Sequence, residues 1–294
     1  MKVKGEHEIY CCGAKVQISE RGIKLLTQPT VEYCPLHEAL YGTKKIDAEA
    51  VLKTIEKKIS GYGFCCENRL LNAEPVVAYG ASEMMQVWLE KSLIDCAVIV
   101  CEGAGTVITS NGELVQATGA KLTGIVRTSP IKSTIEHIET LGGKVLDVKS
   151  ARIDQVEGVK QAFKTGFKRI AVTVAGFQAE TISKIRRFEE KAKTDVLVFS
   201  VCNTCVDDSA VSHIAKADIA CASASKILRE KIATKALMQL GVTIPVYVLT
   251  DKGKRFVLAY LSEFSEKLVV FKTSKLPYNI EGKGPKFKPS DFNQ

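Results

Sequence analysis

The sequence predicts an α/β fold: a mainly parallel sheet, or two such sheets, flanked by helices and preceded by a small β-rich N-terminal region. From residue 73 onward, short apolar runs alternate with segments whose apolar residues recur at helical spacing, the pattern of repeated βα units. The run at residues 94–101 is apolar almost throughout, as expected for a strand covered on both faces. Residues 1–33 instead show the short runs and turns of a β meander.

The N-terminal region is expected to span residues 1–72. After the meander, Pro35 suits the first turn of a short helix that ends near Tyr41. Asp47 is the expected N-cap of a second helix, which continues to about Ile59 and is stopped by the glycines that follow.

The α/β core is expected over residues 73–272. Strands are predicted at residues 75–79, 94–101, 121–126, 145–148, 169–174, 195–201, 218–221 and 244–249. Helices are predicted from Ser82, from Ser129, around Val156, Ile182 and Val211, and over residues 227–240. Repeats of this kind give parallel strands joined by right-handed crossovers. Residues 273–294 are rich in proline and lysine and are expected to form an irregular basic tail.

Charge and hydropathy narrow the classes of partner. The 294 residues include 41 Lys+Arg against 33 Asp+Glu, a net charge of +8 that is spread along the chain. No RNA-binding aromatic motif or zinc-finger spacing accompanies it, so we expect no nucleic-acid partner. No apolar run approaches the roughly 18 residues that span a bilayer, and no export signal is visible. We therefore expect a cytoplasmic protein with no membrane partner, whose excess charge favours a small anionic ligand.

Several of the ten cysteines stand where strands are expected to end. Without export signals, such positions favour a metal, an iron–sulfur cluster or a redox thiol over disulfides. If the N-terminal region folds over the carboxyl edge of the sheet, thiolates from both parts would surround an iron–sulfur cluster or, alternatively, zinc. The candidate metal ligands are Cys34, Cys65, Cys202, Cys205 and Cys221, and His37 is the histidine best placed to join them.

The remaining cysteines have simpler interpretations. Cys96 and Cys101 lie in an apolar run and are expected to be small core residues. Cys11 and Cys12 are adjacent in the β meander. Because neighbours on a strand point to opposite faces, at most one of the two is expected at any single site.

Loops after the predicted strands carry glycines, hydroxyls and cations that suit an anionic ligand beyond the carboxyl ends of the strands. The glycines after Cys101 permit close approach to the backbone, but the third glycine of a dinucleotide fingerprint is missing. The simpler alternatives are a tight turn and serine-capped helices. The candidate cofactor-binding residues are Ser82, Glu102, Gly103, Gly105, Ser223, Ser225, Lys226 and Arg229.

Several segments together resemble the methanogenesis marker protein 8 family. They are Glu32-Tyr33-Cys34-Pro35-Leu36, Gly80-Ala81-Ser82-Glu83, the stretch from Ile94 to Ile108, the stretch from Ile153 to Val159, and Ala220-Cys221-Ala222-Ser223. The resemblance covers about residues 6–260. It implies an association with methane-forming archaea and a role near methyl-coenzyme M reductase, its maturation or its cofactors.

The leading hypothesis is therefore a cysteine-ligated iron–sulfur or metal centre that serves redox chemistry or cofactor maturation in anaerobic C1 metabolism. Two alternatives stay open. One is a metal-free enzyme or binding protein for a small anionic metabolite. The other is an accessory protein that docks on a larger partner enzyme of C1 metabolism.

Overall fold

The computed structural model describes residues 2–72, 74–119, 123–204 and 206–288. Its largest element is an eight-stranded sheet with the strand order β12-β13-β11-β10-β9-β5-β6-β8. The four central strands, β11, β10, β9 and β5, are parallel, and every pairing outside them is antiparallel, so that β13 and β6 run opposite to the other strands. The bounds are β5 (Cys96–Cys101), β6 (Gly105–Thr109), β8 (Lys144–Val145), β9 (Arg169–Ala175), β10 (Asp195–Val201), β11 (Ile219–Cys221), β12 (Met238–Leu240) and β13 (Val246–Val248).

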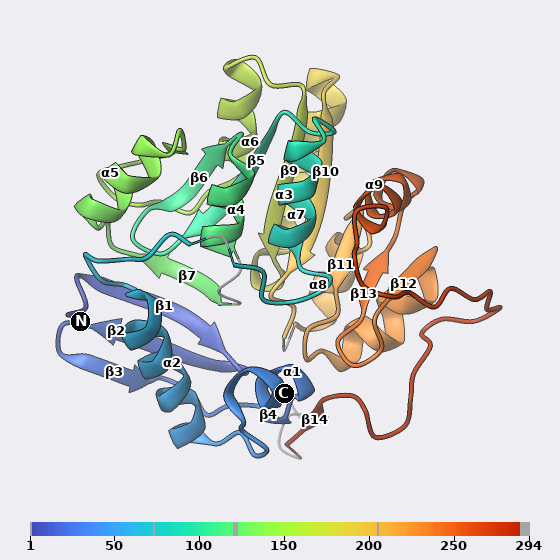
Figure 1. The fold of residues 1–294 in the computed structure, drawn as a ribbon, viewed down its shortest axis with the longest axis horizontal. Coiled ribbons are helices and arrows are strands. Elements are labelled where there is room, and N and C mark those ends of the chain that lie inside the picture. The colour runs from blue at the N-terminus through green and yellow to red at the C-terminus, as the bar shows by residue number, and fades with distance from the viewer. Residues whose placement is uncertain (1, 73, 120–122, 205, 289–294) are drawn as a thin grey trace.

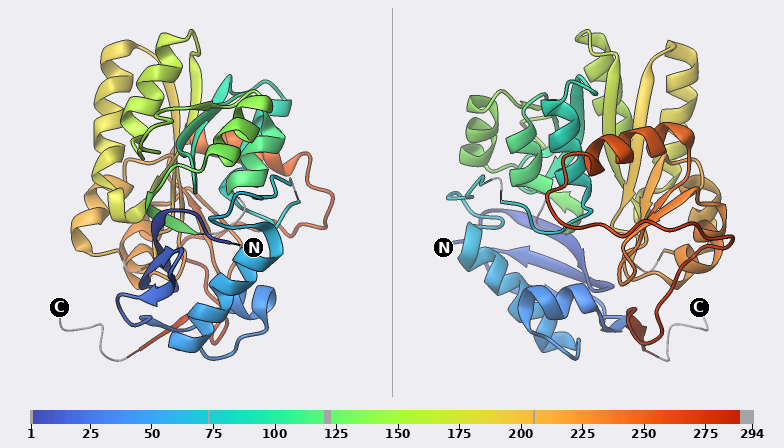
Figure 2. Two further views of the ribbon diagram at one scale, coloured as in Figure 1. Left: turned by 90° about the vertical axis from the view of Figure 1, so that its left-hand side faces the viewer. Right: turned by 45° about the vertical axis from the view of Figure 1, so that its right-hand side comes forward.

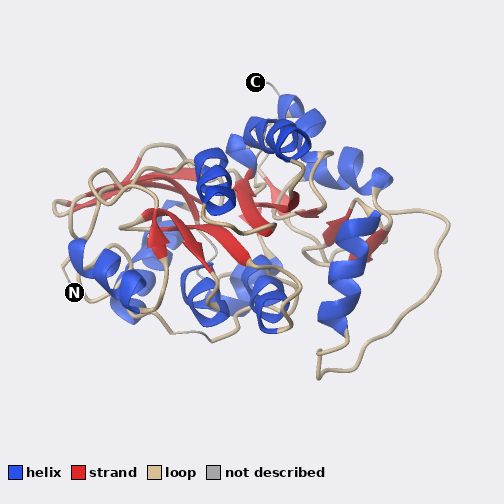
Figure 3. Cartoon of the chain, turned by 90° about the horizontal axis from the view of Figure 1, so that it is seen from above, coloured by secondary structure: helices blue, strands red, loops and turns tan. Residues whose placement is uncertain are grey.

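Helices cover both faces of this sheet (Figure 3). One core contains residues of α3 (Ala81–Glu90), α4 (Gly112–Gly119), α5 (Lys132–Thr140) and α9 (Asp251–Leu261). The other contains residues of α6 (Gln155–Lys164), α7 (Glu180–Ala192), α8 (Asp208–Ile214) and the short helix η2 (Leu228–Ile232). In β5, Ala97 and Ile99 enter the first core, whereas Cys96 and Val98 enter the second. This alternation explains why the strand is apolar throughout.

The N-terminal region forms a separate antiparallel sheet that lies beneath the large one in Figure 1, with strand order β3-β2-β1-β7. Apolar residues of α2 pack on it, among them Val51 and Ile55 against Ile9 and Val16. The bounds are β1 (Glu6–Cys11), β2 (Ala14–Ser19), β3 (Gly22–Leu25), β7 (Gly124–Thr128) and α2 (Ala48–Tyr62). A third, two-stranded sheet pairs β4 (Val31–Tyr33), just before α1 (Pro35–Tyr41), with β14 (Lys286–Phe287) near the C-terminus.

The α/β class and the β-rich N-terminal region are confirmed, and the core strands form one sheet rather than two. The sheet is mixed, because four of its strands run antiparallel to their neighbours. The strand predicted at residues 121–126 is present as β7 over Gly124–Thr128, but it belongs to another sheet than predicted. Residues 120–122 lie outside the described part of the chain, and β7 joins the N-terminal sheet beside β1.

Other predicted elements differ for local reasons. Residues 75–79 form no strand, because the Glu83 carboxylate accepts hydrogen bonds from the backbone N–H groups of Val76 and Val77 at 3.1 and 3.2 Å. The helix predicted over residues 227–240 ends with η3 (Ala233–Lys235), and β12 follows. α3 begins one residue before Ser82, with Gly80 as its N-cap. A further strand that was not predicted, β6, begins at Gly105.

The tail after α9 runs as an extended loop along the side of the molecule before β14 returns to the N-terminal region (Figure 2). Within the described ranges, no helix is both long enough and apolar enough to cross a membrane.

Candidate functional site

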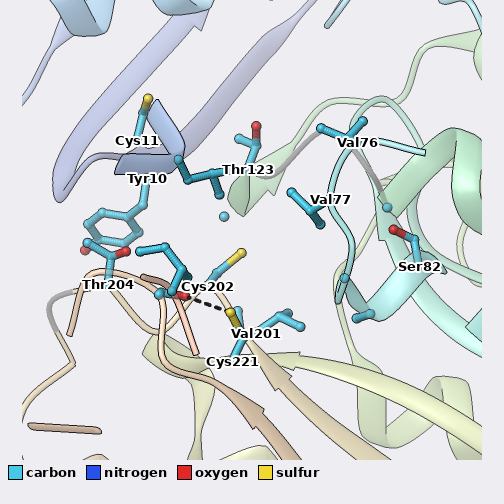
Figure 4. Close-up of a pocket in the computed structure, with 18 of the residues that line it drawn as sticks. Tyr10, Cys11, Val76, Val77, Ser82, Thr123, Val201, Cys202, Thr204 and Cys221 are labelled. Carbon is cyan, nitrogen blue, oxygen red and sulfur yellow. Dashed lines mark hydrogen bonds between the residues drawn. The ribbon is translucent and has the colours of Figure 1, made fainter. Parts of the chain in front are cut away.

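A cavity of about 700 Å³ lies where the N-terminal region meets the carboxyl ends of the central parallel strands. The upper wall in Figure 4 is the β1–β2 hairpin with Cys11, and the lower wall is formed by the ends of β10 and β11 with Cys202 and Cys221. Valines and isoleucines from both regions line much of the rest. The thiols among its described lining residues belong to Cys11, Cys12, Cys34, Cys202 and Cys221.

These thiols follow one another along the wall as electrostatic neighbours. A thiolate at Cys34 would raise the pKa of Cys12, and a thiolate at Cys221 would raise the pKa of both Cys34 and Cys202. Burial raises the pKa of Cys34 and of Cys221, and it raises the pKa of Cys202 to about 12. At neutral pH these three side chains are therefore thiols, unless a metal or another cation stabilises the charged form.

Cys11 is different. A hydrogen bond from Cys12 lowers the pKa of Cys11 to about 7, and the positive charge of Lys58 contributes to the shift against the opposing effect of burial. Lys58 comes from α2 and is 3% exposed, and its ammonium donates to the Thr123 hydroxyl at 2.5 Å. Cys11 therefore ionises more readily than Cys34, Cys202 or Cys221, whose pKa values burial raises.

The turn beneath this pair is strained. Cys11 pairs with Ala14, and the two-residue loop between them has φ of 51° at Cys12 and 80° at Gly13. Positive φ at both loop positions is the type I′ geometry, in which asparagine or glycine is the usual first residue. A cysteine there costs backbone energy, of order 1–3 kcal/mol.

The opposite wall shows the same signature. Cys202 and Ser223 have φ of 51° and 49°. Between them, Asn203 is fully buried: its amide donates to the Cys221 carbonyl at 2.8 Å, and its backbone N–H donates to the Ser223 hydroxyl at 3.1 Å. Left-handed backbone at three non-glycine residues of one cavity is typical of functional sites, where structure maintains strain for a purpose.

His37 lies in the same wall and is 6% exposed. Its Nε2 is 2.9 Å from the Thr54 hydroxyl, which itself donates to the Ala50 carbonyl at 2.9 Å. Because the Thr54 hydroxyl donates its only proton to Ala50, it must accept a hydrogen bond from His37. Nε2 of His37 therefore carries the ring proton, and Nδ1 has a free lone pair. Nδ1 is buried and has no hydrogen-bond partner among the described residues. Burial lowers the pKa of His37 to about 4, so the ring is neutral.

This burial predicts a pH dependence of stability. Below pH 6.5 the unfolded histidine binds a proton, whereas the folded one does so only near pH 4. The unfolded state therefore binds more protons in this window, and stability falls as the pH falls from 6.5 to 4, by up to about 3 kcal/mol. Urea unfolding at pH 7 and pH 5 should show a smaller loss for His37→Gln than for the unmodified chain. The same substitution at the exposed His137 should leave the loss unchanged, and equal losses in all three proteins would contradict the assignment.

Of the predicted metal ligands, the structure brings Cys34, Cys202 and Cys221 together, and Cys205 lies outside the described residues. Cys65 is fully buried elsewhere, and its charge neighbours include Cys101, Glu102 and Arg69. The expectation that at most one of the adjacent Cys11 and Cys12 serves a site is wrong, because Cys12 has left the strand for the turn and both line the cavity.

Lys58 was not predicted from the sequence, because it resembles any other lysine of an amphipathic helix. The Cys11–Cys12 pair carried one usable signal: a glycine follows it directly in a predicted meander, which indicates a tight turn.

The predicted anion-binding residues are dispersed. Ser82, Glu102 and Ser223 line the cavity. Gly103 and Gly105 shape the β5–β6 hairpin turn instead, where an added Cβ on Gly105 would clash with the backbone of Ala151.

The predicted anion-binding residues that follow Cys221 are also not gathered around one point. The Ser225 hydroxyl accepts from the Leu228 N–H at 3.3 Å, and Lys226 pairs with Glu230 at 3.6 Å. Arg229 donates to the carbonyls of Ser223 and Thr243 at 3.2 and 3.1 Å, so it organises the chain behind the cavity wall. Across the described part of the chain, no three histidine, cysteine or acidic side chains are placed to hold a single metal ion.

Comparisons with known proteins identify relatives without a described activity. A family model described as "Uncharacterized protein conserved in archaea (DUF2099)" matches residues 7–262. The "Uncharacterized protein MJ0054" of Methanocaldococcus jannaschii is 39% identical over 258 residues, which is 87% of this chain and 90% of the relative. The cavity walls from Cys11 to Ser223 all fall inside the matched region.

Proposed function

The chain belongs to this family of proteins conserved in archaea, and we propose that its cavity binds an iron–sulfur or related metal–sulfur centre. The observation that carries the proposal is the convergence of thiols from three separate chain segments on one cavity. Cys34, Cys202 and Cys221 would be the ligands, since thiolates are the ligands that soft metals and clusters prefer. Zinc is the alternative metal for the same thiols.

A single ion and a cluster would place different demands on the spacing of these thiols. Four thiolates about 2.3 Å from one zinc ion stand roughly 4 Å from one another. A cluster several atoms across holds its cysteines farther apart, as walls of an open cavity do. Zinc would require Cys34, Cys202 and Cys221 to move onto one ion, because no three such side chains of the described residues are placed to hold one, whereas a polynuclear centre would not require them to meet at one point.

The proposed setting is cytoplasmic anaerobic C1 metabolism, in redox chemistry or cofactor maturation. Support for this setting comes from the motifs that resemble the methanogenesis marker protein 8 family, including the cavity segments around Cys34 and Cys221.

The direct test is to measure iron, acid-labile sulfide and zinc in protein purified without oxygen, together with its visible spectrum. We expect iron and sulfide in stoichiometric amounts and visible absorption that dithionite bleaches. Stoichiometric zinc without sulfide would identify the single-ion site. Protein that stays metal-free after reconstitution with iron and sulfide would refute the proposal.

A second candidate function is the binding of a small metabolite with an apolar body and an anionic group. The observation that favours it is Lys58, a buried cation in a wall built largely from apolar side chains. Metal-free protein whose thermal stability rises with such a ligand, and does so no longer after Lys58→Met, would support this function.

A further inference from the structure

We propose that Cys11 is the nucleophile of the cavity and undergoes thiol–disulfide exchange with a low-molecular-mass disulfide that carries an N–H or O–H group. Cys11 is not among the proposed metal ligands, so the inference does not depend on the metal–sulfur centre. It follows from the groups that face Cys11 and from an unused acceptor in the cavity wall.

Each element around Cys11 contributes a group that suits a thiolate. From the hairpin, the Cys12 thiol donates a hydrogen bond to the Cys11 sulfur. From α2, the Lys58 ammonium supplies the positive charge, fixed through the Thr123 hydroxyl. From α1, Tyr41 also stands near, and burial raises the pKa of its phenol to about 12, so it adds no negative charge at neutral pH. The thiolate is the species that attacks disulfides.

The backbone shows that this arrangement is maintained at a cost. Cys12 occupies the first loop position of a type I′ turn, where asparagine or glycine would relieve strain. Glycine has no side-chain donor and asparagine has no thiol, so neither of the favourable residues could place an S–H group beside Cys11. Cys11 and Cys12 are each only partly buried and both line the cavity, and the Cys11 sulfur points away from Cys202 and Cys221 in Figure 4, so a ligand would reach it from the side of α1 and α2.

The chemical class of the ligand follows from His37. Its Nδ1 is buried without a partner, on a side chain that is 6% exposed and lines the same cavity. An orphaned buried acceptor is costly, and a bound hydroxyl, amine or amide would satisfy it. The apolar walls suit the carbon chain of such a ligand, and the Lys58 charge would stabilise the thiolate that departs.

The proposed step is balanced without an external oxidant or reductant. The Cys11 thiolate attacks one sulfur of a disulfide R–S–S–R, and the ligand's S–S bond breaks as the Cys11–S–S–R bond forms. The second half leaves as R–S⁻ and takes a proton from solvent. The ligand is reduced by one thiol equivalent, and Cys11 is oxidised to the mixed disulfide.

The test uses bis(2-hydroxyethyl) disulfide, a small neutral probe with a hydroxyl at each end. Full-length protein, purified without oxygen and treated with a chelator, is mixed with the probe at pH 7, and the mixed disulfide is located and timed by peptide mass spectrometry. We expect the first label on Cys11. Lys58→Met should slow labelling about 2-fold because the thiolate fraction falls, and Lys58→Arg should restore most of the rate.

His37→Phe supplies an independent readout. It should weaken saturation by this hydroxyl-bearing probe but not by diethyl disulfide, which lacks the hydroxyl. Cys96→Ala, a buried thiol away from the cavity, is the matched control and should label at the unmodified rate. First labelling at another cysteine, or an unchanged rate in a folded Lys58→Met protein, would overturn the inference. Neither result bears on whether Cys34, Cys202 and Cys221 bind metal.

Discussion

Replacing Cys221 with alanine is expected to remove most of the iron from the protein while the chain stays folded. Cys221 lies at the end of β11 and is a neighbour of both Cys34 and Cys202. Its loss therefore removes the thiol that lies between the other two proposed ligands. Residues that only hydrogen-bond to metal ligands already contribute about 10–100-fold in affinity, and a lost ligand should cost more than that. Iron and sulfide per chain, measured after purification without oxygen, check this expectation.

The control for that experiment is Cys65→Ala. Both thiols were candidates by sequence, but Cys65 is fully buried and does not line the cavity. Cys65→Ala should therefore retain its iron. Urea unfolding should place both variants within about 1 kcal/mol of the unmodified chain, as expected for a small truncation. Full iron retention in Cys221→Ala, or equal loss in both variants, would rule out Cys221 as a specific ligand.

Replacing Arg69 with methionine is expected to lower the free energy of unfolding by about 3–5 kcal/mol. Arg69 and Glu102 form an ion pair whose side chains are 1% and 2% exposed. The guanidinium also donates to the carbonyl of Ala117 at 3.2 Å and to that of Leu70, so it fastens the segment before residue 73 to α4. Without it, the Glu102 carboxylate is left buried and uncompensated at the cavity wall. Urea unfolding at pH 7 measures the loss.

The double variant Arg69→Met with Glu102→Met separates the cost of a stranded charge from the value of the pair. Removing both charges replaces a buried ion pair with apolar side chains, which is often nearly neutral. We expect the double variant to recover at least half of the stability lost by Arg69→Met. A double variant as unstable as the single one would show that the carbonyl contacts of Arg69, rather than the ion pair, hold this region.

The sequence was most informative where burial on two faces leaves a continuous apolar run, as in β5, β9 and β10. It failed where the partner of a strand decides its direction. β6 follows a glycine turn back along β5, and β13 runs antiparallel to β11, yet both have the composition of parallel core strands. β7 was misplaced because nothing in residues 124–128 specifies that β1, rather than the large sheet, is its neighbour.

The location of the site was foreseeable, but its full membership was not. Cys202 and Cys221 end predicted parallel strands, and the rule that ligands bind at such ends pointed to them. Cys12 joins the site only because of a turn geometry that cysteine rarely adopts. Lys58 joins it only because α2 packs its buried face toward the cavity. Both depend on tertiary contacts that no local pattern encodes.

The pairing of β1 with β7 also sets the order in which this molecule can be completed during synthesis. His7 and Thr128 are bonded across a separation of 121 positions, at 2.6 Å. The first hairpin can close as soon as it leaves the ribosome, but an isolated two-stranded hairpin is only marginally stable. The N-terminal sheet receives its fourth strand, β7, only after β5 and β6 have been synthesised. The cavity can form only after β11 has been synthesised. A nascent chain therefore presents its cysteines uncovered for most of translation, and any centre bound to them is inserted late.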